Sequence, residues 1–344
     1  MSDTEKMSLN EFKNALKPFT LEKPEKKPKE NYVSILILRE LKSAARFTTD
    51  GIEANSAVVR IGGIEETVGK LFGRKQVASD RRKAKALQRT LISEEMGKVM
   101  DKNGWKGCTM KVNEMCQRCP ECALFGSAAS EGGMSITSRV MYDEAYTIRA
   151  LSAIVDEFFQ NAPGDDYAKE ATSAIREPDF FKEGTLFPCV VTLKDVTSEE
   201  VLFFLNVTDR NSRYGATGTR FGKTQNHILG IYAGHREGPS SLEVSKEIAL
   251  TLAKQGLEKN DPEYSKKVDE RLKKEVMYRD TLSTDEIKTA AIKAFESLSN
   301  KQRIDYLKFD EVQSLKVLEE IRDDKVVQSI LSDQIAKIST FLGA

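Results

Sequence analysis

Apolar runs of strand length alternate with polar segments through the first two thirds of the chain. The run from Tyr32 to Arg39 is apolar on both faces, which predicts a strand in the centre of a sheet. The polar turn from Thr48 to Gly51 separates it from a second run, and Gly62 with Gly63 ends that run. In all, the pattern predicts strands over residues 32–39, 52–61, 136–149, 186–193, 201–207 and 227–232.

A second pattern places apolar residues three or four positions apart, which is typical of helices. It occurs in a strongly basic segment before position 102 and in most of the chain after Leu242. Ser283 and Glu286 have the spacing of a capping box, which marks the start of one such helix. Helices are predicted over residues 9–16, 79–102, 151–159, 283–298 and 327–342.

The order of these elements predicts an α+β protein with three parts. Residues 1–30 form a flexible tail, because prolines and charges dominate positions 23–29. Residues 31–240 form a sheet core, with the basic helix and a cysteine-containing subdomain inserted at about residues 70–135. Residues 241–344 form a helical C-terminal region.

Composition fits a globular protein: 40% of the 344 residues are hydrophobic and 31% are charged. No apolar run approaches the roughly 18 residues of a membrane span, and the first residues lack the apolar stretch of a signal peptide. We therefore expect a cytoplasmic protein with no membrane partner. The formal net charge is zero, so bulk charge does not indicate nucleic-acid binding.

Four of the five cysteines lie close together, with the spacing C-x7-C-x2-C-x2-C. In a reducing compartment such clusters are metal sites more often than disulfides. Four thiolates suit a structural zinc ion and leave no open position for catalysis. An iron–sulfur cluster and four unligated thiols are the alternatives. The predicted metal ligands are Cys108, Cys116, Cys119 and Cys122, whereas Cys189 is expected to be buried in a strand.

The charge is not spread evenly: eight basic residues and a single acid, Asp80, lie between Lys70 and Arg89. Such a block is either a solvated helix face or a phosphate-binding surface. The predicted helix carries three cations in its first turn, Arg81, Arg82 and Lys83, which the helix dipole disfavours. A bound anion at that turn would offset this cost.

A glycine-rich stretch from Arg210 to Thr224 looks at first like a phosphate-binding P-loop. The P-loop pattern requires glycine at position 217, which is Thr217, and a strand rather than a helix is predicted to follow. We therefore exclude a nucleotide-hydrolysing loop. The stretch still carries four cations beside flexible glycines, which suits a phosphodiester backbone, although a purely structural turn remains the alternative. These cations are Arg210, Arg213, Arg220 and Lys223.

Signals for catalysis are weak. The two histidines, His227 and His235, flank an apolar strand without a nucleophile in sequence reach, which predicts core or surface roles. Asp50 and Glu53 lie in or after a polar turn and could bind a divalent ion, but acids in such turns are usually turn formers.

The combination of three motifs resembles one protein family. Cys119-Pro-Glu-Cys122-Ala-Leu-Phe-Gly126, then Ser138-Arg-Val-Met-Tyr-Asp143, then Arg213-Tyr-Gly-Ala-Thr-Gly-Thr-Arg-Phe-Gly222 is similar to the backbone (Cas-seven) subunits of class 1 CRISPR effector complexes, in the RAMP superfamily. The cysteine set and the helical C-terminus look most similar to the type I-D member.

This resemblance implies an RRM-like (ferredoxin-like) antiparallel sheet and a non-catalytic subunit that polymerises along CRISPR RNA. The subunit would present the guide for pairing with target DNA, in contact with other copies of itself and other effector subunits. The implied RNA contacts are Arg46, Arg81, Arg82, Lys83, Arg213, Arg220 and Lys223. Some relatives cut their target with an acidic residue and a metal ion, so a metal-dependent endonuclease with Asp50 as ligand is the alternative.

Overall fold

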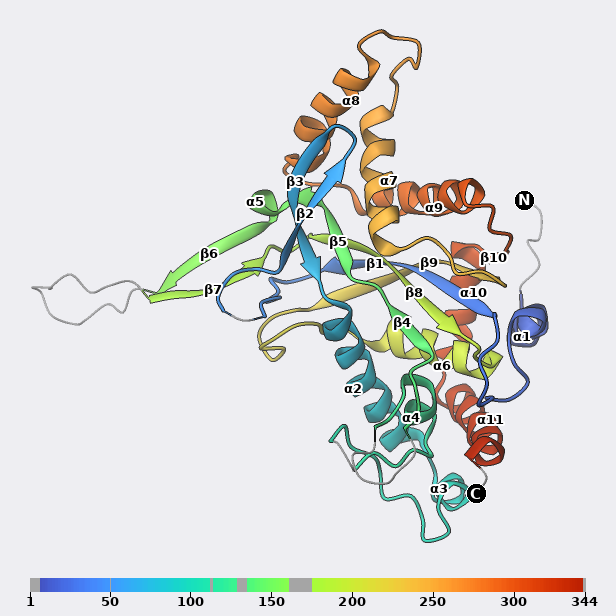
Figure 1. The fold of residues 1–344 in the computed structure, drawn as a ribbon. Coiled ribbons are helices and arrows are strands. Elements are labelled where there is room, and N and C mark those ends of the chain that lie inside the picture. The colour runs from blue at the N-terminus through green and yellow to red at the C-terminus, as the bar shows by residue number, and fades with distance from the viewer. Residues whose placement is uncertain (1–6, 50, 112–113, 129–134, 161–174, 343–344) are drawn as a thin grey trace, which may run out of the picture.

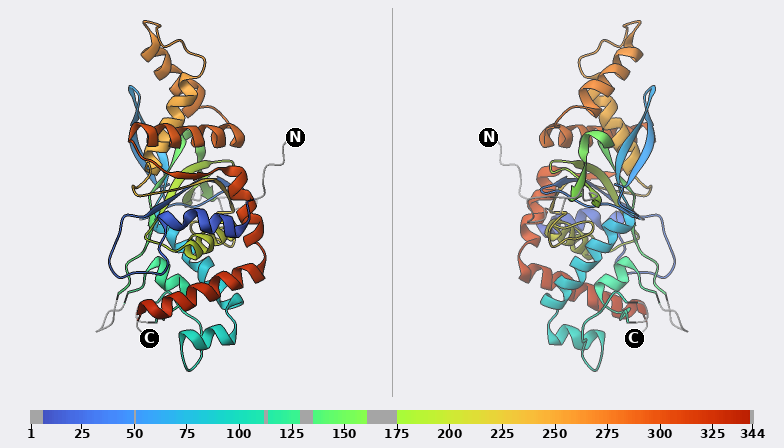
Figure 2. Two further views of the ribbon diagram at one scale, coloured as in Figure 1. Left: turned by 90° about the vertical axis from the view of Figure 1, so that its right-hand side faces the viewer. Right: turned by 90° about the vertical axis from the view of Figure 1, so that its left-hand side faces the viewer.

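A five-stranded antiparallel sheet lies at the centre of the protein, with helices on both faces (Figures 1 and 2). We describe the fold from a computed structural model, which describes residues 7–49, 51–111, 114–128, 135–160 and 175–342. The strand order is β10-β9-β1-β8-β4. The strands are β1 (Tyr32–Leu41), β4 (Val140–Tyr142), β8 (Leu186–Lys194), β9 (Thr224–Gly234) and β10 (Leu307–Phe309).

Strand β1 is the middle strand, as its double-sided apolar pattern predicts. Ile35 and Ile37 face one layer of helices, whereas Leu36 and Leu38 face the other, and all four are fully buried. Strands β8 and β9 flank β1, and both run antiparallel to it. They are therefore parallel to each other, and the segment between them crosses one face of the sheet as a split βαβ unit.

That crossing segment is helix α6 (Ser198–Arg210), so the strand predicted over residues 201–207 is wrong. Thr197 caps the helix, and Glu200 completes a capping box with it. Every residue from Glu199 to Thr208 is buried, so the helix is covered on all sides and its apolar run from Val201 to Leu205 shows no helical period. A short apolar run of this kind cannot be assigned to strand or helix from periodicity alone.

Two smaller sheets extend from the central one. A three-stranded sheet has the order β2-β3-β5, and a two-stranded hairpin projects from the body (Figure 1). These strands are β2 (Ser56–Ile61), β3 (Ile64–Leu71), β5 (Ala145–Ala150), β6 (Val155–Gln160) and β7 (Ile175–Phe181). As predicted, Gly62 and Gly63 end β2, and the chain continues directly into β3, which the sequence pattern did not indicate.

Several predicted boundaries in this region need correction. The strand predicted over 136–149 is two strands, β4 and β5, which belong to different sheets. The helix predicted over 151–159 is a single turn, α5 (Leu151–Ile154), followed by β6. The strand predicted from position 52 begins at Ser56. In the first two cases one apolar run covers two elements, because the change of direction falls inside the run.

One layer of helices covers the face of the central sheet that bears Ile35 and Ile37. Its members are α1 (Leu9–Leu16), the 3₁₀ turn η1 (Lys17–Phe19), α2 (Gly73–Leu91), α3 (Glu94–Met100), α4 (Pro120–Phe125), α6, α10 (Glu311–Ile321) and α11 (Asp324–Leu342). In α1, Phe12 and Leu16 are fully buried, and the Phe12 and Phe309 rings lie 4.6 Å apart. The expected flexible tail therefore includes a packed helix, since these two apolar residues bind it to the core.

The basic helix differs from its prediction at both ends. It begins at Gly73 rather than Ser79, after Phe72, which forms no side-chain cap and so leaves no capping signal in the sequence. It ends at Leu91, because Ile92 is extended and Ser93 caps the separate helix α3. Arg81, Arg82 and Lys83 thus lie in the middle of α2, and the predicted first-turn anion site is wrong.

The second layer covers the face that bears Leu36 and Leu38. It comprises α7 (Ser241–Lys254), α8 (Tyr264–Arg271), the π-helical segment η2 (Leu272–Met277) and α9 (Thr284–Lys301). Ser283 caps α9, as predicted. The helical C-terminal region is confirmed, although the short strand β10 interrupts it and pairs with β9. None of the helices in the described ranges is long and apolar enough to cross a membrane.

Candidate nucleic-acid groove and metal centre

An open groove of about 420 Å³ lies where helix α2 meets the glycine-rich loop that precedes β9. Backbone of the loop forms one wall, and three cations of α2 project from the other. Its lining residues are Thr49, Arg74, Lys75, Ala78, Arg82, Gly215 and Ala216. The two basic segments, about 130 positions apart in sequence, therefore share one surface.

Helix α2 presents a different set of residues in each direction. Arg74, Ala78 and Arg82 are spaced four apart and line the groove. Arg81, Lys85 and Arg89 have the same spacing and contact the cysteine segment instead. Gln76 and Asp80 are fully buried and turn toward β1.

The glycine-rich loop is folded tightly against the segment that follows β1. The amide of Ala216 donates to the Arg46 carbonyl at 3.1 Å, and the amide of Gly222 donates to the Ala44 carbonyl at 2.7 Å. Gly215 and Gly222 have φ of +90° and +78°, a region that disfavours other residues. After Lys223 the chain continues into strand β9, which agrees with the exclusion of a P-loop.

A buried polar network beneath the groove joins this loop to α2 and to the central sheet. Arg39 Nη1 donates to the Tyr214 hydroxyl at 2.5 Å and to Asn226 Oδ1 at 2.7 Å. Asp80 accepts hydrogen bonds from Tyr214 and Tyr142 and lies 3.7 Å from Arg39 Nη2. Burial, followed by the charge of Asp80, raises the pKa of Tyr142 well above its ordinary value, so this hydroxyl stays a donor.

The predicted RNA contacts fall into two groups. Arg82 lines the groove, and three others are exposed on the glycine-rich loop beside it: Arg213, Arg220 and Lys223. Arg213 also donates to the Phe221 carbonyl at 3.0 Å, and Arg220 lies 5.6 Å from the centre of the Phe221 ring. Arg210 instead pairs with Asp324 at 2.7 Å.

The remaining predicted contacts have other surroundings. Arg46 packs 4.7 Å above the Phe221 ring and pairs with Glu177. Arg81 pairs with Glu121 at 2.5 Å, and Lys83 is half-buried on α2. Two groove cations, Arg74 and Lys75, are not among the predicted contacts, although both belong to the basic block that indicated this surface.

The four clustered cysteines converge on one point, as their spacing predicts. Their sulfur atoms all lie within 4.8 Å of one another, and Cys108 Sγ lies 3.5 Å from Cys122 Sγ. A tetrahedral ion with metal–sulfur bonds of about 2.3 Å needs sulfur–sulfur distances of about 3.8 Å. The cluster therefore has ligands whose number and spacing fit one metal ion. Cys189, by contrast, is buried in β8, as predicted.

Helices close around this cluster. Cys119 is the residue directly before α4, and Cys122 lies within that helix. Cys116 donates its amide hydrogen to Cys108 Sγ at 3.2 Å. Ile335 of α11 packs on the cluster from the C-terminal region. In the described part of the chain, this is the one group of histidine, cysteine or acidic residues arranged to hold a metal ion.

The structure describes three of the four candidate catalytic residues. Asp50 lies outside the described residues, and Glu53 is exposed. His227 contacts Glu40 at 2.8 Å, and His235 contacts the Glu30 carbonyl at 3.2 Å.

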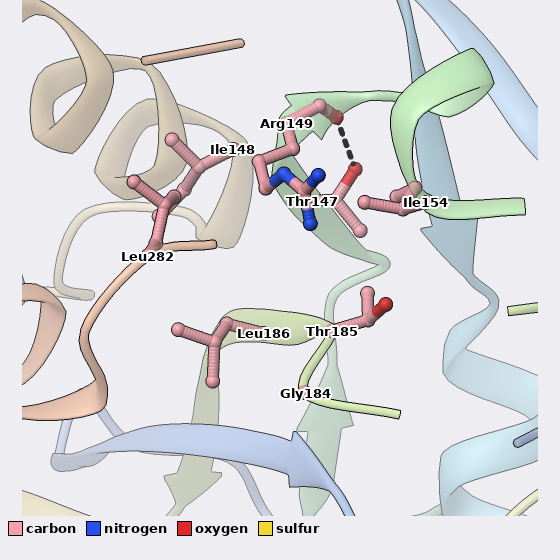
Figure 3. A pocket seen from close by; sticks show the side chains of 8 residues that line it. All are labelled: Thr147, Ile148, Arg149, Ile154, Gly184, Thr185, Leu186 and Leu282. Carbon is pink, nitrogen blue, oxygen red and sulfur yellow. Dashed lines mark hydrogen bonds between the residues drawn. The ribbon is translucent and has the colours of Figure 1, made fainter. Parts of the chain in front are cut away.

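A second cavity is too small for a ligand. It lies between β5 and the start of β8, near Thr147, Thr185 and Leu282 (Figure 3). Its volume of about 10 Å³ corresponds to roughly one water molecule. The basic groove is thus the better candidate for binding a large partner.

Comparison with known proteins agrees with the motif resemblance. A sequence profile of the Csc2 CRISPR family matches residues 11–333. The chain belongs to the Csc2 CRISPR family. This membership confirms the CRISPR-associated resemblance drawn from the cysteine and glycine-rich motifs. No curated protein matches in sequence.

One solved structure shows the same fold. The crystal structure of Thermofilum pendens Csc2 superposes with a TM-score of 0.63 at 17% identity, over 96% of this chain and 95% of that one. A chain of a structure described as a CRISPR RNA-guided surveillance complex, pre-nicking, has a TM-score of 0.48 at 12% identity, over 80% of this chain and 90% of that one. This Csc2-family chain therefore shares its overall architecture with the Thermofilum protein.

Proposed function

We propose that this Csc2-family protein is a non-catalytic backbone subunit of a type I-D CRISPR effector complex. It binds CRISPR RNA, polymerises along it with other copies of itself and presents the guide for pairing with target DNA. Its central sheet, with the split βαβ unit around β1, serves as an RRM-like core. One observation carries the proposal: the groove between α2 and the glycine-rich loop.

The groove has the chemistry of a phosphate-backbone site. Arg74 and Arg82 are exposed on one side of it, and loop backbone forms the opposite wall at Gly215 and Ala216. Arginine side chains provide forked donors to phosphate oxygens, and such contacts carry no base preference. This fits a subunit that holds any guide sequence and leaves its bases free to pair.

We further propose that Cys108, Cys116, Cys119 and Cys122 bind a structural zinc ion. Four sulfur ligands complete a tetrahedral shell, so no position remains for an activated water. When bound, the ion would cross-link α4, through Cys119 and Cys122, to the segment that contains Cys108 and Cys116.

Binding tests the groove directly. In the variant Arg74→Ala/Arg82→Ala we expect weaker binding to RNA oligonucleotides of every sequence. The slope of log Kd against log salt concentration should fall by about 1 for each phosphate that the protein no longer neutralises. Arg60→Ala is the matched control, because Arg60 is exposed on β2 and lies outside the groove. Unchanged affinity and slope in the double variant would exclude the groove as the RNA site.

Assembly is tested separately. If the protein polymerises along its guide, the number of copies per RNA, measured by native mass spectrometry, rises stepwise with RNA length. A constant single copy on long RNA would contradict the backbone role.

A further inference from the structure

A lysine side chain is buried directly beside the four cysteines. Lys85 is only 2% exposed, and its ammonium nitrogen lies 3.1 Å from Cys108 Sγ and 3.9 Å from Cys122 Sγ. The same nitrogen donates to the Glu121 carboxylate. Its three hydrogens are thus directed to two sulfur atoms and one carboxylate.

Two further cations of the same helix face fix the surroundings of this lysine. Arg81 pairs with the other oxygen of Glu121, and Arg89 donates to the Cys108 carbonyl at 2.5 Å. Because Arg81 already provides a partner for the Glu121 carboxylate, that acid alone does not account for a second, deeply buried cation. The negative charge that accounts for the burial of Lys85 lies on the neighbouring sulfur atoms of Cys108 and Cys122.

The charge of four ligating thiolates explains why a lysine is buried beside them. A divalent ion bound by four thiolates has a net charge of roughly −2, and burying that charge is costly unless cations or donors lie nearby. A donor to a ligating sulfur also draws electron density from it and holds it in place.

We propose that Lys85 is a positioning residue of the metal centre, whose ammonium group donates to the ligating sulfurs of Cys108 and Cys122 and slows loss of the ion. This inference rests on the zinc site proposed above. Lys85 is not itself a ligand, because the four sulfurs already fill the shell and an ammonium group has no lone pair to share. Its role is to offset the charge of the sulfurs.

The test compares zinc release from purified full-length protein. Lys85→Met removes the charge and keeps the bulk of the side chain, and transfer of zinc to a chromogenic chelator should become about 10- to 100-fold faster. Cobalt substitution gives an independent readout. Without the ammonium group the sulfur electrons are higher in energy, so the sulfur-to-cobalt charge-transfer band should move to longer wavelength.

Two further variants keep the result interpretable. Lys98→Met is the control, because Lys98 is exposed on α3, and both its release rate and its spectrum should match the wild type. Lys85→Met/Glu121→Gln removes the buried lysine and acid together, which preserves folding if the single variant fails to fold. It should show the same fast release and the same band shift.

The possible failures are distinguishable. Wild-type protein that holds no zinc, and gives no cobalt–thiolate spectrum, overturns the zinc site and this inference with it. Wild-type protein that holds zinc, with release from both Lys85 variants within twofold of wild type and an unshifted band, overturns the role of Lys85 alone.

Discussion

The hydroxyl of Tyr214 donates to Asp80 Oδ1 over 2.6 Å and joins the glycine-rich loop to helix α2. Both side chains are buried, so neither is accessible to a ligand in the groove above them. Their bond nevertheless fixes the distance between the two walls of that groove. The groove cations and the loop backbone are therefore held as one unit by residues that carry no binding function of their own.

Removal of Asp80 should damage both stability and binding. Asp80→Ala leaves the guanidinium of Arg39 buried without its carboxylate, which should lower the free energy of unfolding by about 3–5 kcal/mol. RNA affinity should fall as well, because the loop loses the bond between Tyr214 and Asp80 that ties it to α2. Thermal unfolding and fluorescence anisotropy measure the two effects. The exposed Asp305→Ala variant should change neither, and a stable, fully binding Asp80→Ala protein would show that the network is dispensable.

The backbone conformation of the glycine-rich loop also depends on its glycines. A Cβ atom at Gly222 would lie 2.0 Å from the Tyr214 carbonyl oxygen, and φ there is +78°. Gly222→Ala should therefore destabilise the protein by about 1–3 kcal/mol and weaken RNA binding. Gly218 is the matched control in the same loop, since a Cβ there meets nothing within 4 Å. Equal unfolding temperatures for Gly222→Ala and Gly218→Ala would contradict the strained-loop interpretation.

Acid stability should depend on Glu199. Burial raises the pKa of this carboxyl, but hydrogen bonds from Lys13 and Lys337 outweigh burial and lower the pKa to about 2. A depressed folded-state pKa stabilises the protein above the unfolded value of about 4.5 and loses that effect as pH falls toward 2. The unfolding temperature of Glu199→Gln should thus change less than that of wild type between these pH values.

The exposed Glu320→Gln variant serves as the reference for that series. Suppose the unfolding temperature of Glu320→Gln becomes as insensitive to pH as that of Glu199→Gln. The contacts of Glu199 in α6 with Lys13 in α1 and Lys337 in α11 are then not the origin of the pH dependence.

Metal removal should unfold one region before the rest. Chelation, or Cys119→Ser, removes the cross-link around α4, and amide hydrogen exchange should rise first in residues 94–111 and 114–126. Strands β1, β8 and β9 should keep their protection, because their pairing does not involve the cysteines of the cluster. Simultaneous loss of protection in both regions would mean that the metal holds the whole fold together.

Local chemistry in the sequence was sufficient to predict several features of the protein. The double-sided apolar run of β1 predicted the central strand, and the cysteine spacing predicted the cluster. Both depend on residues close together in the chain, for which spacing determines geometry. The basic block and the glycine-rich loop were each predicted as phosphate-binding candidates, and the structure brings them to one groove.

Features that depend on tertiary contacts could not be predicted in this way. Arg39 ends an apolar run and carries no sign of a buried partner, because Asp80 and Tyr214 reach it only after the sheet and α2 have packed. Arg81 lies next to Arg82 in the basic block but faces Glu121, because consecutive residues of a helix point about 100° apart. Helix α6 was misassigned because burial on all sides removes its period.

The central position of β1 has a consequence for synthesis of the protein. β1 is made early, but its partners β8 and β9 follow much later, with β9 ending about 190 residues after β1. At a translation rate of about 5–20 residues per second, roughly 10–40 s pass between synthesis of β1 and completion of its neighbouring strands β8 and β9. Truncated chains that end before residue 186 therefore expose an unpaired, aggregation-prone strand, and productive folding of the sheet is a late event on the ribosome.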